Sequence, residues 1–565
     1  MNEKEKDNKN KSTEPPWISS SEILNIHEES FKSQNQKVTV QESEKYKFIF
    51  FDYMFIFVLF VLSFVLTFST VDDYGLCWDE AYYYEPSEQA SLFIKDFFKG
   101  DIDFSQKSVD SYWDKIVELP AFCKILWGSG ILFFDGLLWH VTALRLPNVI
   151  IFSSLIVLIY IFVLPYYGRT VAAASSISFL IIPRIFGHSH IAETDMIITF
   201  MILLTTYTWL KGLNSVIWSI ITGVIFGLAL NTKINVFFLL PVLVLWSQIY
   251  HRKKYINNLF CILLISPIVW FLTWPWLWSD TLTRLLDYLK FHTTHQLTSA
   301  YYFGKLYQNI SAPFHYPFAM TFFTLPVTVL IFSLISFIFI FKNTRSKPIG
   351  ILILLNALVP LLINALPSSP TYDGIRLFMP AFPFIAIMSG IGLGIIIDWI
   401  DKKSPVYFKY KNISLTPYFF ILIIFLIGIY EIYKIHPYEL CYFNQFIGGV
   451  EGAHNKGMET TYWGEVINED VTDYINKNIP KNANVKLLAL HEKIFEYYQK
   501  WGIIREDIKF DGEPPYDFHI LLCRQGFFGR AEDMIYNAKM PKHIFALNSV
   551  PLLIIADTRE LGYLQ

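Results

Sequence analysis

Long apolar runs recur through the first 433 residues of the chain, and polar segments separate them. A helix needs roughly 17–25 mostly apolar residues to cross a hydrocarbon core of about 30 Å. The fold class that this pattern predicts is mainly α, a polytopic membrane protein. Eleven membrane-spanning helices are predicted, near residues 49–70, 146–164, 171–187, 196–212, 215–231, 234–250, 256–273, 317–341, 348–366, 377–399 and 415–433.

The two ends of the chain have a different pattern. Residues 1–48 are polar and rich in Lys, Glu, Asn and Ser, which predicts a disordered cytoplasmic tail before an uncleaved signal anchor. Residues 434–565 contain no membrane-length apolar run, and helical patterns alternate with short β-rich runs. This segment is predicted to be a small external α/β domain, with helices at 470–478, 494–501 and 531–538 and strands at 485–490, 518–522 and 550–555.

Composition supports the membrane class. Of the 565 residues, 53% are hydrophobic and only 17% are charged, whereas soluble domains average about 25% charged residues. The net charge of -3 carries little information, because charges on opposite faces of a membrane do not average. The five cysteines form no CxxC pair and no zinc-binding spacing.

The distribution of Lys and Arg predicts the orientation, because cytoplasmic connections carry an excess of these residues. With eleven spans and a cytoplasmic N-terminus, the C-terminal domain lies outside. The basic residues that follow the even-numbered spans are Arg169, Lys211, Arg252, Lys253, Lys254, Lys342, Arg345, Lys347, Lys402, Lys403, Lys409 and Lys411.

Two long loops fall on the external face. Loop 71–145 contains amphipathic segments, which predict either helices lying in the membrane interface or a small soluble helical subdomain. Loop 274–316 is rich in Trp, Tyr and His, which suits an interfacial aromatic belt and also suits stacking on a sugar. The sequence leaves both alternatives open.

An acidic pair, Asp79 and Glu80, lies about ten residues beyond the first predicted span. Asp79 is a candidate general base for an acceptor hydroxyl, since a carboxylate can take this proton when it lies within hydrogen-bond reach. Glu80 is a candidate to orient the acceptor or bind a cation. The alternative is a pair of solvated loop carboxylates.

Further charged residues gather at the same predicted boundary, where an unpaired charge costs several kcal/mol. Lys233, Arg376 and Arg184 are candidates to bind a lipid phosphate, and snorkelling to the headgroups is the alternative. A second acidic motif contains Asp195, Glu193, His188 and His190. We predict hydrogen-bonding roles for this motif, with no bound metal and no cofactor. A divalent cation near Glu80, His190 and Asp195 is the weaker alternative.

The order of these motifs resembles the GT-C glycosyltransferases, in particular the protein O-mannosyltransferase and aminoarabinose transferase group (glycosyltransferase family 39). The resemblance covers about residues 50 to 470. The chain departs from many bacterial relatives at Glu118-Leu119-Pro120-Ala121, where those proteins have His-Pro-Pro. The motifs that carry the resemblance are Trp78-Asp79-Glu80, Arg145-Leu146-Pro147, Gly187 to Asp195, Pro313 to Pro317, Tyr372 to Pro380, Tyr438 to Asn444 and Glu459 to Gly464.

The resemblance implies a GT-C-like module over residues 49–433, a polyprenyl-phosphate sugar donor and an inverting transfer. It also implies that Asp79 is the base and that Lys233 and Arg376 serve the lipid phosphate. The acceptor hydroxyl is expected on a protein Ser or Thr or on a glycolipid, at the non-cytoplasmic face of a bacterial inner membrane. No nucleic-acid partner is expected.

Two other function classes are alternatives: a transporter or flippase for lipid-linked sugars, and a membrane assembly factor whose tail binds partners. A transporter predicts internal repeats and charges at mid-depth in broken helices. The sequence shows no repeat, and its charges gather at one boundary. A glycosyltransferase is therefore the leading hypothesis.

Overall fold

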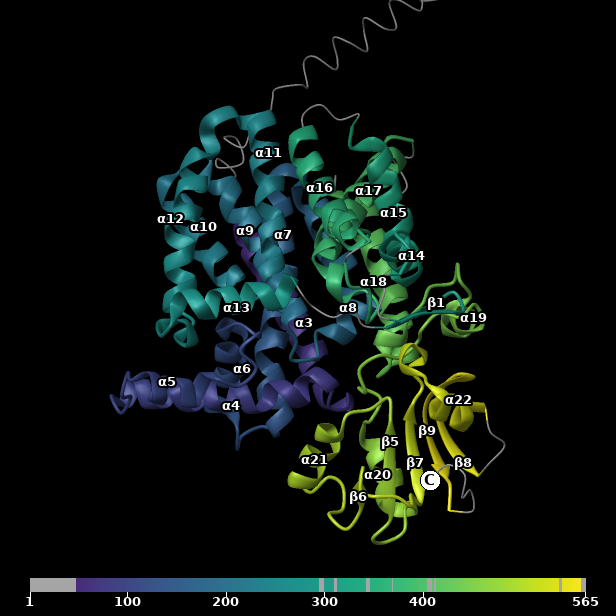
Figure 1. Cartoon of the computed structure of the whole chain (residues 1–565). Coiled ribbons are helices and arrows are strands. Elements are labelled where there is room, and N and C mark those ends of the chain that lie inside the picture. The colour runs from purple at the N-terminus through teal and green to yellow at the C-terminus, as the bar shows by residue number, and fades with distance from the viewer. Residues whose placement is uncertain are drawn as a thin grey trace, which may run out of the picture.

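The computed structural model describes residues 47–293, 299–308, 312–341, 346–367, 369–403, 409–410, 413–537 and 541–559. The predicted tail at 1–48 lies outside these residues except for its last two positions. A body of helices occupies one part of the molecule and a smaller α/β domain lies at one end of it (Figure 1).

The helical body carries the predicted membrane-spanning segments. Six of its described helices are long and apolar enough to cross a membrane, namely those at Phe50–Asp73, His140–Leu180, Arg252–Leu272, Lys347–Asn364, Arg376–Lys403 and Thr416–Ile435. The total of eleven spans stays a prediction, because several of the other apolar helices are shorter. The helices of the body are α3 (Phe50–Phe68), α7 (His140–Leu180), α8 (Pro183–His188), α9 (Thr194–Gly212), α10 (Val216–Leu230), α11 (Leu239–His251), α12 (Ile256–Leu272), α14 (Tyr316–Thr324), α15 (Val327–Phe339), α16 (Lys347–Asn364), α17 (Phe382–Lys403) and α18 (Thr416–Ile435).

Two predicted boundaries differ from the structure for local reasons. The predicted break between 164 and 171 is a kink inside α7, where Gly168 adopts a positive φ of 82°. The predicted span at 317–341 is divided at Pro326, which cannot donate a backbone hydrogen bond. The side-chain amide of Asn444 donates to the carbonyls of Phe322 and Leu325 at 2.6 and 2.9 Å, so it satisfies groups that the break leaves open.

The two long loops fold into helices that run across the end of the body nearest the α/β domain (Figure 1). They are α4 (Trp78–Lys99), α5 (Gln106–Trp113), α6 (Ala121–Phe134) and α13 (Thr281–Thr293), with a hairpin of β1 (Ala300–Tyr302) and β2 (Lys305–Tyr307). The acidic pair lies in the first turn of α4, which begins seven residues earlier than the amphipathic pattern from Glu85 indicates. The carboxylate of Glu80 accepts the backbone N–H of Cys77 at 3.0 Å and thereby caps this helix.

The C-terminal domain is built on a five-stranded sheet with strand order β6-β5-β7-β9-β8. Strands β5, β6 and β7 are parallel, whereas β9 is antiparallel to both β7 and β8. All three predicted strands and all three predicted helices are present, and β6 and β8 are strands that were not predicted. The elements are α19 (Gly449–Asn455), α20 (Glu469–Asn478), α21 (Glu492–Lys500), α22 (Arg530–Asn537), β5 (Asn484–Leu488), β6 (Lys509–Phe510), β7 (Phe518–Leu522), β8 (Lys542–Leu547) and β9 (Val550–Asp557).

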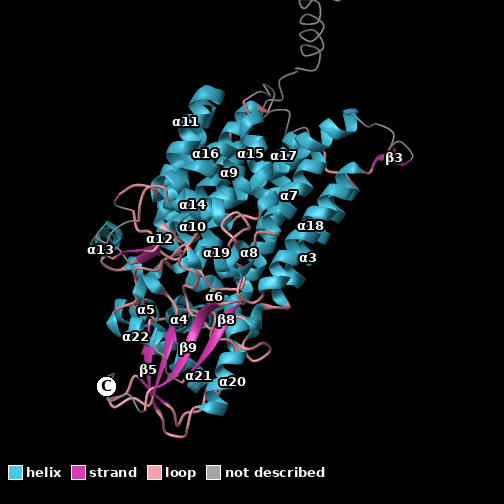
Figure 2. Ribbon diagram, turned by 90° about the vertical axis from the view of Figure 1, so that its right-hand side faces the viewer, coloured by secondary structure: helices cyan, strands magenta, loops and turns pink. Residues whose placement is uncertain are grey.

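The hydrophobic core of this domain extends into the first loop. Leu76, Ala81 and Val141 belong to the same buried cluster as Val485 and Ile520 of the sheet. In Figure 2 the sheet lies directly beneath the ends of the helices. The start of α4 is therefore packed between the helical body and the α/β domain, and Asp79 lies at this junction.

The remaining elements connect these parts. The connection between α11 and α12 lies at the end of the body opposite the α/β domain (Figure 1) and contains Arg252, Lys253 and Lys254. This placement agrees with the predicted separation of basic connections from the acidic motifs. The connecting elements are the 3-10 helices η1 (Val71–Asp73), η2 (Ile234–Phe238), η3 (Arg252–Tyr255), η4 (Pro275–Trp278), η5 (Arg376–Ala381), η6 (Glu439–Cys441) and η7 (Gln525–Phe527) and the strands β3 (Lys409–Tyr410) and β4 (Ile413–Ser414).

Candidate active site

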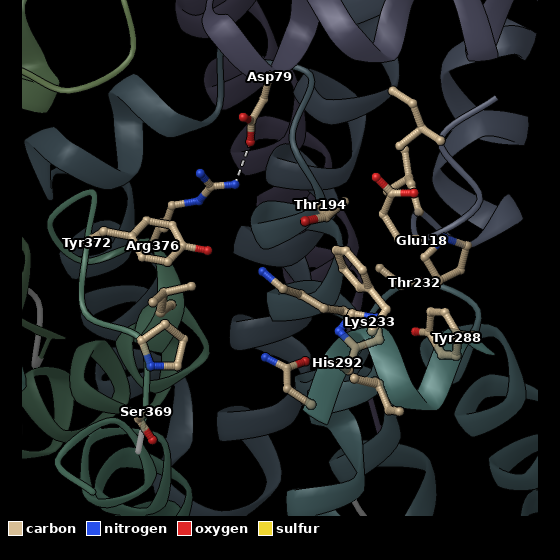
Figure 3. Close-up of a pocket in the computed structure, with 18 of the residues that line it drawn as sticks. Asp79, Glu118, Thr194, Thr232, Lys233, Tyr288, His292, Ser369, Tyr372 and Arg376 are labelled. Carbon is tan, nitrogen blue, oxygen red and sulfur yellow. Dashed lines mark hydrogen bonds and ion pairs between the residues drawn. The ribbon is translucent and has the colours of Figure 1, made fainter. Parts of the chain in front are cut away.

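A cavity of about 800 Å³ opens between α4, the η2 connection, α13 and the loop before η5. Asp79, Lys233 and Arg376 all line it, although they come from distant parts of the sequence. Figure 3 shows Arg376 and Lys233 reaching into the cavity from opposite walls, with Asp79 above Arg376. The structure thus brings together three of the predicted site residues. Aromatic and polar side chains from the loops complete the lining, among them Trp78, Tyr82, Tyr83, Glu118, Thr194, Thr232, Tyr288, Phe291, His292 and Tyr372.

Asp79 and Glu80 are neighbours on a helix, so their side chains leave the axis in different directions. The Asp79 carboxylate faces the cavity and is about one-fifth exposed. Its Oδ2 accepts a hydrogen bond from Arg376 Nη2 at 2.6 Å and a longer one from the Tyr83 hydroxyl at 3.4 Å. Its Oδ1 receives no hydrogen bond from any residue in the described ranges, so this oxygen can accept a proton or a hydrogen bond from a bound molecule.

Arg376 is the centre of the ionic network. Its guanidinium donates to Asp79, to Asp195 Oδ2 at 3.1 Å and to Asp373 Oδ2 at 2.8 Å. Its Cζ lies 4.1 Å from the ring centre of Trp463, a cation–π contact. Three carboxylates and one indole therefore fix a side chain that is otherwise flexible.

Lys233 lies between α10 and η2, where a buried cation needs a partner. Its ammonium donates to Asp195 Oδ1 at 2.5 Å, and a quarter of the side chain is exposed to the cavity. Asp195 is buried in the first turn of α9 and accepts from both Lys233 and Arg376. The carboxylate therefore lies behind the two cations and holds them at the cavity wall.

Glu80 has a different place from the one predicted. Its carboxylate is fully buried and forms a two-pronged ion pair with Arg145, at 2.7 and 2.6 Å. It also accepts the backbone N–H of Ala192 at 2.8 Å. Glu80 does not line the cavity. It connects the start of α4 to α7 and to the turn before α9, and so sets the positions of Asp79 and Asp195 relative to each other.

The histidines of the second acidic motif are engaged in packing. His190 is held by the Thr70 hydroxyl at 2.8 Å and the Phe186 carbonyl at 2.7 Å, and its ring stacks on Tyr74. His188 pairs with Glu193 at 3.1 Å beneath the Trp463 ring. Neither histidine nor Glu193 lines the cavity. Among the described residues, no group of three or more His, Cys, Asp or Glu side chains is arranged to hold a metal ion.

Arg184 is also outside the cavity. Its guanidinium is buried, donates to the Tyr442 carbonyl at 2.9 Å and packs on the Phe443 ring. A Cβ at Gly374 would lie 2.5 Å from Arg184 Nη1, and Gly374 has a positive φ of 66°. Arg184 therefore supports the turn that precedes Arg376. Because it does not line the cavity, it is not placed to contact a phosphate there, contrary to the prediction.

Some residues of the network were not expected from the sequence. Asp373 lies three residues before Arg376 in the motif Tyr372 to Pro380, and this position is the signal that could have identified it. Trp463 and Arg524 come from the C-terminal part of the chain. Trp463 lies in the motif Glu459 to Gly464, whereas no local pattern marks Arg524. The same part contacts the cavity wall directly, since His491 lies against both Trp78 and Tyr82.

Glu459 is a buried carboxyl of the C-terminal part that accepts the Gly526 N–H at 2.7 Å. Burial raises its pKa to about 7 from an ordinary value of 4.5, although the nearby Arg524 opposes the rise. The folded protein therefore holds the proton of Glu459 more tightly than the unfolded chain does. The resulting stabilisation is complete below about pH 4.5 and is lost as the pH rises through about 7.

Glu459→Gln does not titrate at this position. Its free energy of unfolding relative to wild type should therefore rise by on the order of 2 kcal/mol between pH 5 and pH 8. Thermal unfolding in detergent at both pH values measures the difference. The matched control is Glu506→Gln, at an exposed position of the same domain. A constant difference between Glu459→Gln and wild type at both pH values would contradict the assignment.

Comparisons with known proteins agree with this architecture. Residues 132–274, which include Asp195 and Lys233, match the model of the family described as dolichyl-phosphate-mannose-protein mannosyltransferase. The sequence has no significant match among curated proteins. The apo crystal structure of ArnT from Cupriavidus metallidurans has a TM-score of 0.50 at 14% identity, and covers 89% of this chain and 98% of ArnT.

Two further structures are similar at lower scores. ArnT from the same organism bound to undecaprenyl phosphate has a TM-score of 0.49 at 14% identity, with 90% of this chain and 98% of ArnT covered. The Archaeoglobus fulgidus oligosaccharyltransferase, tethered to an acceptor peptide, has a TM-score of 0.43 at 12% identity. The match covers 82% of this chain and 60% of the oligosaccharyltransferase. The match to a mannosyltransferase family favours an enzyme over a transporter. Residues 132–274 therefore resemble a mannosyltransferase family, and the chain as a whole shares the fold of ArnT.

Proposed function

We propose that the chain transfers a sugar from a polyprenyl-phosphate donor to an acceptor hydroxyl, with inversion, and that Asp79 is the general base. The observation that carries the proposal is the single cavity in which a carboxylate with an open oxygen meets two cations. The base serves the attacking hydroxyl, whereas the cations serve the leaving phosphate. The name of the matching family supports a lipid-phosphate donor.

An apolar extension of the cavity supports a lipid tail on the donor. A pocket of about 60 Å³ between α9, α11 and α16 shares Asn235, Phe238 and Leu377 with the main cavity. Its other walls are largely aliphatic and include Ile202, Val242 and Val359. A prenyl chain that enters between these helices would place its phosphate beside Lys233, since Lys233 directly precedes η2.

The transfer proceeds by a single displacement at the anomeric carbon. The acceptor oxygen attacks this carbon from the side opposite the phosphate, and Asp79 Oδ1 takes the hydroxyl proton. The bond between the anomeric carbon and the phosphate oxygen breaks, and the polyprenyl phosphate leaves with an additional negative charge. Lys233 and Arg376 stabilise that charge, and the proposed step uses no metal and no cofactor.

Donor binding also changes the contact between Asp79 and Arg376. The Arg376 guanidinium contacts three carboxylates, and Asp79 is the one of the three that lines the cavity. A donor phosphate that takes over Nη2 replaces the Asp79 carboxylate there. Asp79 Oδ2 then loses its partner Nη2, and the carboxylate can turn toward the acceptor.

The acceptor class and the orientation also belong to the proposal. The acceptor is a Ser or Thr hydroxyl of a protein or a hydroxyl of a glycolipid, and the reaction takes place at the non-cytoplasmic face of a bacterial inner membrane. The position of the basic α11–α12 connection at the far end of the body supports this orientation.

The phosphate site is tested by replacing Lys233 with Met. Loss of a charge-assisted contact should weaken the binding of undecaprenyl phosphate by about 10- to 100-fold. Binding is measured by titration of the purified protein in lipid nanodiscs, and acceptor KM should change little. Lys486→Met is the matched control, since Lys486 pairs with Asp511 at 3.0 Å in the α/β domain. Wild-type affinity in Lys233→Met and in Arg376→Met would remove both residues from the donor site.

A further inference from the structure

The guanidinium of Arg376 is held from the side of the C-terminal domain. Trp463 stacks on it, and the indole Nε1–H of the same residue donates to Asp373 Oδ2 at 2.7 Å. Arg376 Nη1 donates to that same oxygen at 2.8 Å. Asp373 Oδ2 therefore accepts hydrogen bonds from both Arg376 and the Trp463 ring that covers it.

The other oxygen of Asp373 is held by Arg524. Arg524 Nη2 donates to Asp373 Oδ1 at 2.6 Å, and Arg524 Nη1 donates to the Tyr462 carbonyl at 3.0 Å. The guanidinium lies 3.8 Å from the ring centre of Phe527, and the side chain is almost fully buried. Arg524 lies at the end of β7, so its position is set by the central part of the sheet.

Asp373 needs such support because its backbone is strained. Its φ of 52° lies in the left-handed region, which is costly for a residue other than glycine. A strained residue persists when its surroundings hold it in place. Arg524 and Trp463 use both carboxylate oxygens of Asp373, and Arg376 is attached to the same group.

We propose that Arg524 and Trp463 are positioning residues for the donor phosphate. They fix Asp373, and Asp373 fixes the guanidinium of Arg376 at the cavity wall. An unrestrained arginine loses rotamer freedom when it binds a ligand, so a pre-positioned one binds more tightly. The C-terminal domain therefore completes the donor site rather than only covering it. The inference rests on the proposed function, because it assigns the phosphate to Arg376.

The test compares Arg524→Met with Arg376→Met in the full chain in lipid nanodiscs, with undecaprenyl phosphate as the probe. Arg524→Met should weaken binding about tenfold and leave acceptor KM unchanged, and Arg524→Lys should recover part of the loss. Arg505→Met is the matched control, since Arg505 bonds within the same domain to Asn476, Ile479 and Asp507. Its affinity should stay within about twofold of wild type.

A double variant separates the coupling of Arg524 to Arg376 through Asp373, here called the relay, from a general effect on folding. Arg376→Met with Arg524→Met should bind no more weakly than Arg376→Met alone, because both changes act through one group. Wild-type affinity in Arg524→Met, with weakened Arg376→Met, would overturn the inference. If Arg524→Met does not fold, Trp463→Phe keeps the stacked ring and removes the hydrogen bond to Asp373, and the same weakening is expected.

Failure of the proposed function would look different. If Arg376→Met binds the lipid phosphate as wild type does, the phosphate site is wrong, and the relay is then decided by thermal unfolding without ligand. Non-additive shifts in Tm for Arg376→Met and Arg524→Met show that Asp373 couples them, whereas additive shifts overturn the relay.

Discussion

Asp79→Asn is expected to lower the rate of sugar transfer by about 10²- to 10⁴-fold while the protein still folds and binds undecaprenyl phosphate. The amide keeps the shape of the carboxylate and can still accept the hydrogen bond that Arg376 Nη2 donates at 2.6 Å. It cannot take the proton of the attacking hydroxyl. Release of the sugar from the lipid is the measurement in vitro, and mass spectrometry of glycans and glycolipids is the measurement in cells that carry only the variant.

A matched change controls for the loss of one carboxylate. Asp110 forms a two-pronged pair with Arg284 at 2.7 Å in the same loop region and is about as exposed as Asp79. Asp110→Asn should keep transfer within a few-fold of wild type, because Asp110 does not line the cavity. Full turnover in Asp79→Asn would show that another group is the base.

Glu80→Ala is expected to destabilise the protein by about 3–5 kcal/mol, the cost of leaving a buried charge without its partner. Arg145 would keep only its bonds to the carbonyls of Val71, Tyr74 and Gly75. Two backbone N–H groups, at Cys77 and Ala192, would also lose their acceptor. Thermal unfolding in detergent measures the loss, and donor binding should weaken with it, since the start of α4 moves relative to α9.

The comparison variant lies on the same helix. Glu85 pairs with Lys115 at 3.4 Å, and both side chains are exposed. Glu85→Gln should cost less than about 1 kcal/mol, as expected for a surface pair. Replacing both Glu80 and Arg145 by Met should recover part of the loss in Glu80→Ala, because no charge is then left without a partner. Equal stability of Glu80→Ala and Glu85→Gln would contradict the buried-pair interpretation.

Much of the architecture follows from local patterns. Hydrophobic runs predict the membrane class, and the alternation of β-rich and helical segments predicts three of the five strands of the external sheet. The gathering of charges at one boundary predicts that Asp79, Lys233 and Arg376 share a cavity, as the structure shows. These predictions succeed because each depends on a property of one segment: the periodicity of its apolar residues, the length of its apolar run, or the energetic cost of a charge within it.

The remaining features depend on tertiary contacts. Glu80 and Arg184 look like Asp79 and Arg376 in the sequence, but both are bonded to distant groups and neither lines the cavity. Strand β8 was missed because most of its side chains are exposed or partly exposed, so its pattern has no continuous apolar face. Arg524 is separated from Asp373 by about 150 residues, and no pattern in either segment indicates the other.

The hydrophobic core shared between the first loop and the α/β domain limits how this protein can be divided. A chain shortened to end after α18 would remove the partners of Leu76, Ala81 and Val141 and expose them to water. It would also take away the groups that keep Asp373 in its strained conformation. We therefore expect the helical body to be unstable without the α/β domain, and a hybrid with the tail of a relative would need a matching set of interface residues to be stable.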